Sequence, residues 1–419
     1  MPKPARVFEH GTLRIGEQGL TQSRFEALVR YNDRNGSRFF TVGSRCLHFS
    51  SFVGVIQVGA LAIEILPKAD KRAADDVSKW QRALLQMLRQ VGVLRGEPAA
   101  DAILHLRRSP LIDVYITSFL DEVEHLTHAG LAKKYRRAEG NLHKLKGRIL
   151  FRQQITRNLL HRERLYTAHE TYDRDNVFNR ILKRALDLIA PLPLPTSMTS
   201  RAAALALCFE DVSDTAITTT TFDSLVFDRT TERYRTAIQL ARLIILNYSP
   251  DLRGGSEHVM AILFDMNRLF EMFILAQLKR ARPALAACRV RLEGQSSKQF
   301  WGRRPLRPDV VAYLEDAGHE PNVHVIIDTK WKIPRDDSPA DDDLKQMYAY
   351  NLHFASTRSV LVYPRADDGQ RACRQRYHPS AALHTHEHEC ATYFVELFDA
   401  DGSLRRDIGN TLIREVIAT

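Results

Sequence analysis

The stretch VIIDTKWK, Val325 to Lys332, places two opposite charges at the end of what otherwise has the composition of a buried strand. Its three leading β-branched residues are typical of a central strand. Asp328 and Lys330 follow, with Thr329 between them. Because side chains alternate between the two faces of a strand, Asp328 and Lys330 point the same way and lie next to each other. An acid and a base therefore share one face at the end of this strand.

A second acid, Asp309, stands at the head of an earlier short strand in RPDVVAYL. The turn-rich stretch EDAGHEP separates the two strands and favours a hairpin. If residues 310–314 pair antiparallel with residues 323–327, the register that matches their ends places Asp309 opposite Asp328. Cross-strand neighbours have Cβ atoms roughly 5 Å apart, so two carboxylates can share one divalent cation. Without a cation, one of the two would have to hold a proton.

Magnesium takes oxygen ligands and would balance the two negative charges, with Mn²⁺ as a plausible substitute. Lys330 could then orient the attacking water or stabilise the charge that develops on a phosphate. That arrangement is suited to metal-assisted phosphodiester hydrolysis. The structural alternative is a solvated ion pair between Asp328 and Lys330, with Asp309 as an ordinary turn acid.

The spacing of Pro308-Asp309 and Asp328-Thr329-Lys330 resembles the PD-(D/E)xK nuclease superfamily. Gln346 and Tyr350 in QMYAY resemble its QxxxY element, because residues four apart share a helix face. Glu271, in the amphipathic stretch MNRLFEMFILAQLKR, is similar to the acid that the first helix of the superfamily often supplies. The resemblance implies a metal-dependent endodeoxyribonuclease whose catalytic residues are Asp309, Asp328, Lys330, Glu271, Gln346 and Tyr350, with Asp309, Asp328 and Glu271 as metal ligands.

Further motifs resemble, in order and spacing, the McrC family of nuclease subunits from McrBC modification-dependent (5-methylcytosine) restriction systems. They are FVGVIQVGALAIEILPKAD at Phe52, GLAKKY at Gly130, LKGRILFRQQI at Leu145, DNVFNRILKRAL at Asp175 and LRPDVV at Leu306. The resemblance implies a phage-defence DNA endonuclease that docks into a McrB-like AAA+ GTPase hexamer and stimulates it. The chain has no GxxxxGK[ST] phosphate loop, so GTP would be bound by the partner.

The pattern along the chain predicts a multidomain α+β protein. We expect an N-terminal β-rich region at 1–165, a helical middle at 166–255 and a C-terminal α/β PD-(D/E)xK domain at 256–419. Residues 1–70 read as β, with short strands in RFEALVRY, RFFTVG and LAIEIL. Helical periodicity predicts helices at 75–93 and 111–129 and in NVFNRILKRALDLIA, RAAALALCFEDV and TERYRTAIQLARLIILNY. The stretch SPDLRGGSE, 249–257, is a predicted linker.

Sixty Lys and Arg against fifty Asp and Glu give a net charge of +10, which favours a polyanionic partner. The block at 130–165 carries eleven Lys or Arg and two acids. It is a DNA track, a surface that meets the partner ring, or simply a solvated face. Its candidates for partner docking are Lys146, Arg148 and Arg152. The cations around the proposed metal site, which we expect to contact DNA phosphates, are Arg303, Arg304, Arg307 and Lys332.

Five scattered cysteines without a CxxC pair suggest reduced thiols in a cytoplasmic protein. No apolar run is long enough to span a bilayer, so we expect no membrane association. The tract HTHEHEC, His384 to Cys390, suggests zinc, but four ligands on one strand face would span about 20 Å, too far for one ion. We expect an exposed strand edge there instead.

Two other functions compete with the restriction endonuclease. One is a RecB-like repair or recombination nuclease that acts without a partner, which robust cleavage in the absence of GTP would favour. The other is a non-catalytic adaptor that only activates a GTPase ring, which a lack of metal-dependent nicking would support.

Overall fold

The computed structural model describes residues 4–68, 77–94, 111–161, 163–249, 258–287, 289–314, 322–334, 337–366, 369–378 and 387–418. They form a mixed α/β protein with several sheets. Contacts divide the chain into two compact units: unit 1 is Met1–Ile56, Leu61–Arg108 and Leu263–Thr419, and unit 2 is Gln57–Ala60 and Ser109–Ile262. This grouping of contacts differs from the ranges 1–165, 166–255 and 256–419, which remain a prediction about folding domains.

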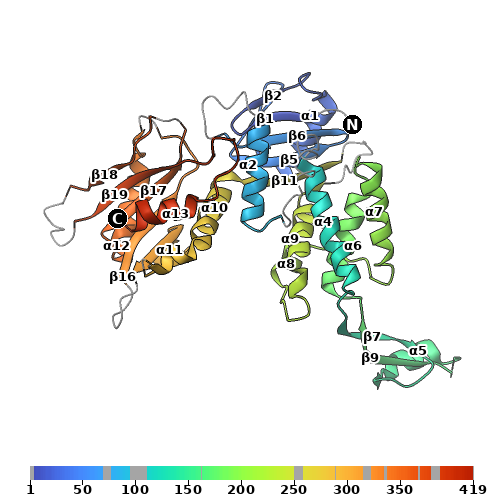
Figure 1. Cartoon of the computed structure of the whole chain (residues 1–419). Coiled ribbons are helices and arrows are strands. Elements are labelled where there is room, and N and C mark those ends of the chain that lie inside the picture. Colours follow the sequence, from blue (N-terminus) through green and yellow to red (C-terminus); the bar gives the residue numbers. More distant parts are fainter. Residues whose placement is uncertain are drawn as a thin grey trace. The chain divides into compact units, whose positions relative to one another are not determined.

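The N-terminal part of unit 1 contains short strands, as the sequence predicts (Figure 1). Strand β1 pairs in parallel with β6, and β4 lies between β2 and β3 in a small antiparallel sheet. RFFTVG and LAIEIL contain β3 and β6, which confirms two of the three predicted strands. The bounds are β1 Ala5–Phe8, β2 Thr12–Arg14, β3 Phe40–Gly43, β4 Cys46–Phe49, β5 Phe52–Val58 and β6 Leu61–Leu66.

The third predicted strand, RFEALVRY, is wrong, because it belongs to helix α1 (Gln22–Arg34). Thr21 caps this helix by accepting a hydrogen bond from a backbone N–H of the first turn. The buried residues Ala27, Leu28 and Tyr31 lie at helical rather than alternating spacing. The turn signals of NDRNGS therefore follow a helix and not a hairpin strand.

The predicted hairpin lies in a six-stranded sheet of order β12-β15-β16-β17-β19-β18 in unit 1. Val310 on β15 lies opposite Ile327 on β16, which confirms the register predicted for this end of the pair. A bulge after Ala312 shifts the other end by one residue, and the turn at 315–321 lies outside the described residues. The bounds are β12 Val290–Gly294, β15 Val310–Leu314, β16 Asn322–Thr329, β17 Arg358–Pro364, β18 Cys373–Arg376 and β19 Glu389–Val395.

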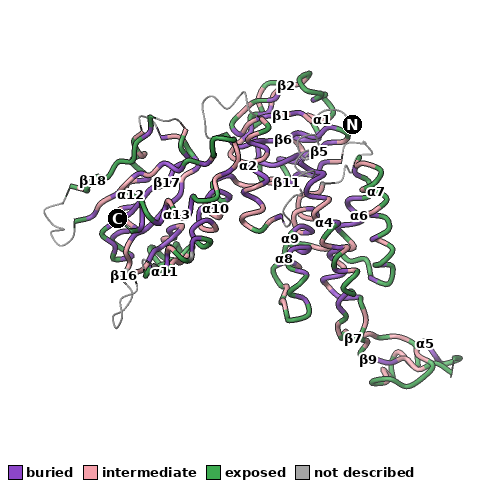
Figure 2. Tube along the Cα trace, viewed as in Figure 1, coloured by how far each residue is buried: buried purple, intermediate pink, exposed green. Residues whose placement is uncertain are grey.

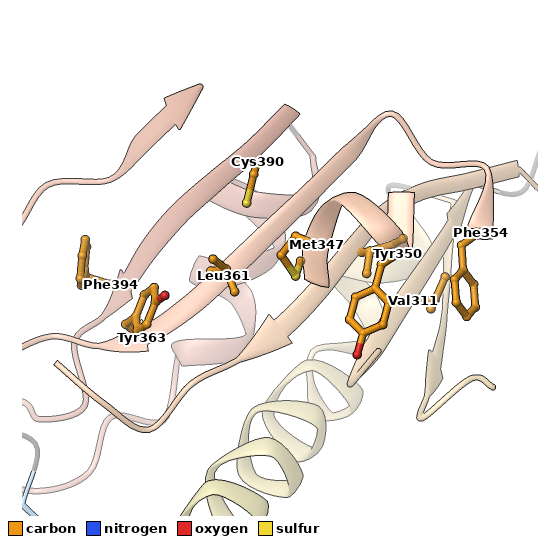
Figure 3. Close-up of a cluster of buried hydrophobic side chains, with 9 residues drawn as sticks. Val311, Met347, Tyr350, Phe354, Leu361, Tyr363, Cys390 and Phe394 are labelled. Carbon is orange, nitrogen blue, oxygen red and sulfur yellow. The ribbon is translucent and has the colours of Figure 1, made fainter. Parts of the chain in front are cut away.

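Helix α12 (Asp341–Phe354) packs against the central strands β16, β17 and β19. Met347 and Tyr350 of this helix join a buried cluster with Val311, Ile326 and Leu361 of the sheet (Figure 3). Figure 2 shows these strands buried along most of their length. The remaining elements of unit 1 are α2 Val77–Gln90, α10 Met266–Arg280, α11 Arg282–Ala287, β13 Lys298–Trp301, β14 Arg304–Leu306, α13 Ile408–Leu412 and the π-helical turn Ile413–Ile417.

Unit 2 is mainly helical, and the helices predicted for the middle of the chain are present. The basic block at 130–165 forms strands β7 and β8 and the short helix α5. Both strands pair with β9 in a three-stranded sheet of order β7-β9-β8. Residues 250–257 of the predicted linker lie outside the described residues. Among the helices that the structure describes, none has both the length and the apolar character needed to cross a membrane. The bounds are α4 Leu111–His128, β7 Lys134–Leu142, β8 Arg148–Ile149, α5 Phe151–Asn158, β9 Leu165–Asp173, α6 Val177–Ile189, α7 Thr196–Leu207, α8 Thr219–Asp223, the 3₁₀ turn Glu232–Tyr234, α9 Arg235–Leu246 and β10 Tyr248–Ser249, with β11 at Val259–Asp265.

Trp331, the second residue after β16, ties the end of that strand to the N-terminal part of unit 1. Its indole Nε1 donates to Oε1 of Glu9 at 2.6 Å, and the backbone N–H of Lys68 donates to the same oxygen at 2.8 Å. The indole ring also packs edge-on against Trp80 and Phe270, with centroids 6.3 and 5.2 Å away. Residues far earlier in the chain therefore fix the strand end that carries the paired charges.

Glu9 makes the stability of the chain depend on pH. Burial raises its pKa from 4.5 to about 7, against the hydrogen bond from Trp331. The folded state therefore holds the Glu9 proton more tightly than the unfolded state does. The stability that this contributes is complete below about pH 4.5 and is lost as the pH rises to about 7.

We expect Glu9→Gln to remove this pH dependence, because glutamine is neutral and can still accept the two hydrogen bonds. Thermal melts between pH 5 and 8 should show that the free energy of unfolding of the unmutated chain falls by roughly 3 kcal/mol relative to that of the variant. Parallel melting curves for the two proteins would contradict the assignment.

Candidate functional site

Asp309 and Asp328 lie opposite each other at the open end of the β15–β16 pair. Because Val310 pairs with Ile327, they are the next residues outward along the two strands. Asp328 is only 3% exposed, and Asp309 is half-buried. Oδ2 of Asp309 accepts hydrogen bonds from both N and Oγ1 of Thr329, each at 2.7 Å. Thr329, which the sequence analysis treats only as a spacer, thus fixes the orientation of Asp309.

Lys330 begins a chain of contacts that runs through helix α12. Its Nζ lies 2.7 Å from Oδ2 of Asp328, which confirms that the two side chains share a face, and it donates to Oε1 of Gln346 at 2.9 Å. Nε2 of Gln346 donates to the Tyr350 hydroxyl at 2.8 Å, which in turn donates to the carbonyl oxygen of Arg307 at 3.1 Å. Helix α12 therefore holds the Lys330 ammonium beside Asp328, through Gln346 and Tyr350 on one of its faces.

One cavity, of about 320 Å³, brings together all six residues that the sequence analysis predicts as catalytic. Glu271 enters it from α10, where its Oε1 accepts a hydrogen bond of 2.6 Å from Nε2 of Gln295. The residues that line the cavity are Asp265, Asn267, Arg268, Glu271, Arg307, Asp309, Asp328, Thr329, Lys330, Gln346 and Tyr350.

Three acids of the cavity, Asp328, Asp309 and Glu271, have a raised pKa and so bind protons more tightly than free carboxylates do. Burial, and then the charge of Asp309, raises the pKa of Asp328 to about 7, while Lys330 opposes the shift. Burial raises the pKa of Asp309 despite its hydrogen bonds with Thr329. Burial and the charge of Asp309 likewise raise the pKa of Glu271. When these acids are ionised, the nearby cations do not fully balance their negative charge, so a bound cation would stabilise the ionised form.

The residues present fit a hard divalent cation. Oδ2 of Asp328 is buried and forms an ion pair with the Lys330 ammonium at 2.7 Å. In the described part of the chain, no three His, Cys, Asp or Glu side chains form a complete metal site. A cation held by Asp309 and Asp328 would thus take its other ligands from water or carbonyl oxygens, as Mg²⁺ commonly does. Direct ligation by Glu271 remains a prediction.

Asp343 is a buried site residue that the sequence analysis misses. Its Oδ2 lies 2.5 Å from Nζ of Lys332, and its Oδ1 lies 3.8 Å from Nζ of Lys330. The Tyr363 hydroxyl donates to Oδ2 at 3.3 Å. The sequence does contain a signal for Asp343: it lies three residues before Gln346, so the two side chains share one face of α12. Lys332, expected to contact DNA, is held by this acid, and its contact with phosphate remains a prediction.

The other predicted contact residues are exposed cations in two different units. Those of unit 1 precede Asp309 in the chain: Arg303, Arg304 and Arg307. Those of unit 2, which were predicted to dock the partner, are Lys146, Arg148 and Arg152. Exposure is compatible with both roles, and both remain predictions.

The prediction of an exposed strand edge at HTHEHEC is wrong for its described end. His388 and Cys390 are buried, at 8% and 7% exposure, because β19 lies between β17 and β18 in the sheet. Nδ1 of His388 lies 3.1 Å from the carbonyl oxygen of Ser356, and Cys390 belongs to the core cluster under α12. His384 and His386 lie outside the described residues.

The family model that matches this sequence is described as McrBC 5-methylcytosine restriction system component, and it covers residues 47–364. The chain belongs to this family. That match confirms the resemblance seen in the motifs from Phe52 to Leu306 and makes the chain a component of an McrBC-type restriction system. No curated protein sequence gives a significant match.

Two solved structures are similar to this McrBC-family chain. One is a half-complex of the tetradecameric assembly of Thermococcus gammatolerans McrB AAA+ hexamers with bound McrC, at 18% identity over 99% of both chains and a TM-score of 0.66. The other is the Thermococcus gammatolerans McrBC complex, at 20% identity over 66% of this chain and 88% of that chain, with a TM-score of 0.50. At these identities the likeness shows a shared fold.

We expect Asp309→Asn to raise the melting temperature of the metal-free chain at pH 8 by about 1 to 3 °C. The substitution removes one of three clustered charges, while an asparagine oxygen can still accept the hydrogen bonds from Thr329. Added Mg²⁺ should raise the melting temperature of the unmutated chain and have little effect on the variant.

Asp342→Asn is the matched control, because Asp342 lies on α12 with its side chain 97% exposed and outside the cavity. Its response to Mg²⁺ should equal that of the unmutated chain. An equal rise in the Asp309→Asn variant would place the cation elsewhere.

Proposed function

We propose that this chain is the Mg²⁺-dependent DNA endonuclease subunit of its McrBC-type system, with a C-terminal domain of the PD-(D/E)xK type. The observation that carries the proposal is the single cavity in which Asp309, Asp328 and Lys330 meet Glu271, Gln346 and Tyr350. A solvated ion pair would not need the burial of Asp328 or the hydrogen bonds that hold Lys330. The reaction class is phosphodiester hydrolysis.

Asp309 and Asp328 would hold the cation, which when bound supplies positive charge for the phosphate oxygens. Thr329 keeps the Asp309 carboxylate oriented toward the cavity through two hydrogen bonds. Lys330 would place its ammonium against the phosphate or the attacking water, and Gln346 limits the positions that its side chain can adopt. Glu271, at the side of the cavity, is suited to hold a water or accept its proton.

The partner that we propose is a McrB-like AAA+ GTPase hexamer. One of the two similar structures, the Thermococcus gammatolerans half-complex, contains McrB AAA+ hexamers with bound McrC. The chain itself has no phosphate loop of the GxxxxGK[ST] type, which supports GTP binding by the partner. In unit 2, the exposed cations Lys146, Arg148 and Arg152 are the proposed docking residues.

We expect Lys330→Ala to reduce DNA cleavage by the reconstituted complex at least about 100-fold, because it removes charge stabilisation at the reacting phosphate. Stimulation of GTP hydrolysis by the partner should be unchanged. Cleavage is followed on modified plasmid DNA with GTP and Mg²⁺, and GTP hydrolysis by phosphate release.

Lys345→Ala is the control, since Lys345 is an α12 lysine with a 76% exposed side chain that lies outside the cavity. Full cleavage by Lys330→Ala would refute the assignment. Strong cleavage by the unmutated chain without partner or GTP would instead favour the stand-alone nuclease.

A separate experiment tests docking. Replacing Lys146, Arg148 and Arg152 together by Glu should abolish stimulation of the partner and GTP-dependent cleavage, because charge reversal opposes binding to the same surface. Copurification of this variant with the partner at unchanged affinity would show that the ring binds elsewhere.

A further inference from the structure

An exposed hairpin of basic and aromatic residues, β13–β14, leads into the strand that begins after Asp309. Residues 298–307, KQFWGRRPLR, carry four cations and no acid. Phe300 and Trp301 keep 53% and 69% of their surface exposed. Large aromatic side chains are costly to leave in water, and the proposed cleavage chemistry does not use either of them.

The backbone of the hairpin presents these two rings at its tip. Lys298 pairs with Leu306 and Trp301 with Arg304, and the register shifts between Gln299 and Trp301, so that Phe300 is an extra residue in its strand. Such bulges redirect side chains and interrupt the regular alternation of faces. Gly302 makes the turn in the left-handed region, at a φ of 55°.

The hairpin, including the Phe300 ring, is fixed to elements that carry the site. Nζ of Lys298 donates to the carbonyl oxygen of His353 at 3.0 Å, at the end of α12, and the ring of Phe300 meets the His353 ring edge-on at 5.1 Å. At the other strand, the Tyr350 hydroxyl donates to the carbonyl oxygen of Arg307. The tip therefore keeps a defined position relative to the acids of the cavity.

We propose that Trp301 inserts against the bases of a DNA duplex beside the phosphate that is cut, while Arg303 and Arg304 hold the DNA backbone. Phe300 anchors the hairpin on His353. This inference rests on the proposed nuclease function and adds the way in which DNA is engaged. An apolar wedge between base steps unstacks and kinks a duplex, and phosphate contacts repay part of that energy. The guanidinium of Arg304 lies 5.7 Å from the centroid of the Trp301 ring, so the same tip combines a ring face with a cation.

Charge favours nucleic acid over a protein as the occupant. Four cations without an acid match the uniform negative charge of a phosphate backbone. Stacking of an aromatic ring is also tolerant of sequence, because every base has a π face. The hairpin would thus position and distort DNA without choosing a site.

The test measures binding of the full-length chain to duplex oligonucleotides that carry 2-aminopurine at successive positions. The unmutated chain should raise 2-aminopurine fluorescence at one base step, because that base becomes unstacked. Trp301→Ala should lose this signal and bind roughly 5- to 150-fold more weakly. Trp301→Phe should keep most of the fluorescence signal and most of the affinity. That result would show that an aromatic ring, and not the fold of the hairpin, is responsible.

Arg303→Gln separates the phosphate contact from stacking. It should keep the fluorescence signal and reduce the slope of log affinity against log salt by about 1, whereas Trp301→Ala should leave that slope unchanged. Val226→Ala, which removes a 78% exposed apolar side chain from unit 2, should change neither quantity.

Two results would overturn the inference while the nuclease function stands. One is cleavage and 2-aminopurine signals for Trp301→Ala equal to those of the unmutated chain. The other is normal DNA binding by Trp301→Ala with loss of self-association or of the partner complex, which would make the tip a protein contact. If the unmutated chain neither binds nor cuts DNA in the reconstituted complex, the proposed function itself fails.

Discussion

Two acids and a lysine at the open end of the β15–β16 hairpin constrain the structure around them. Strand pairing places Asp309 opposite Asp328, and burial removes the water that would otherwise separate their charges. Such a cluster is unfavourable on its own, because like charges in a poorly solvated place repel and take up protons. Its neighbours limit that cost: Lys330 supplies a positive charge, and Thr329 supplies two hydrogen-bond donors.

The surrounding fold holds this cluster from several directions. Tyr350 has its ring in the core cluster (Figure 3), and its side chain also lines the cavity, so the packing of α12 positions Gln346 and Lys330 as well. On the far side of Lys330, Trp331 is held by Glu9 and by aromatic rings from α2 and α10. The N-terminal strands of unit 1 thus support a site made by residues some three hundred positions later in the chain.

The places of Asp328, Lys330, Gln346 and Tyr350 could be predicted from short-range rules, whereas Glu271 was expected only from the family resemblance. Alternation along a strand placed Asp328 beside Lys330, and four-residue spacing placed Gln346 beside Tyr350. The matched ends of two apolar runs fixed the register of the hairpin. The helix at RFEALVRY was missed although its signals are local, namely the capping residue Thr21 and buried residues at helical spacing.

The partners of Glu9 depend on contacts between distant segments, which the spacing of residues along one element does not reveal. The burial of His388 and Cys390 depends on the order of strands in the sheet, and alternation alone does not predict which strand is central. Patterns within single elements thus predicted catalytic residues, whereas the residues that support them were found in the tertiary structure.

Anomalous diffraction from crystals of the chain grown with Mn²⁺ would show whether the paired acids hold a cation. We expect a manganese peak within coordination distance of both Asp309 and Asp328, with Lys330 beside it. Carboxylates turned away from each other, or manganese bound only at other positions, would contradict it.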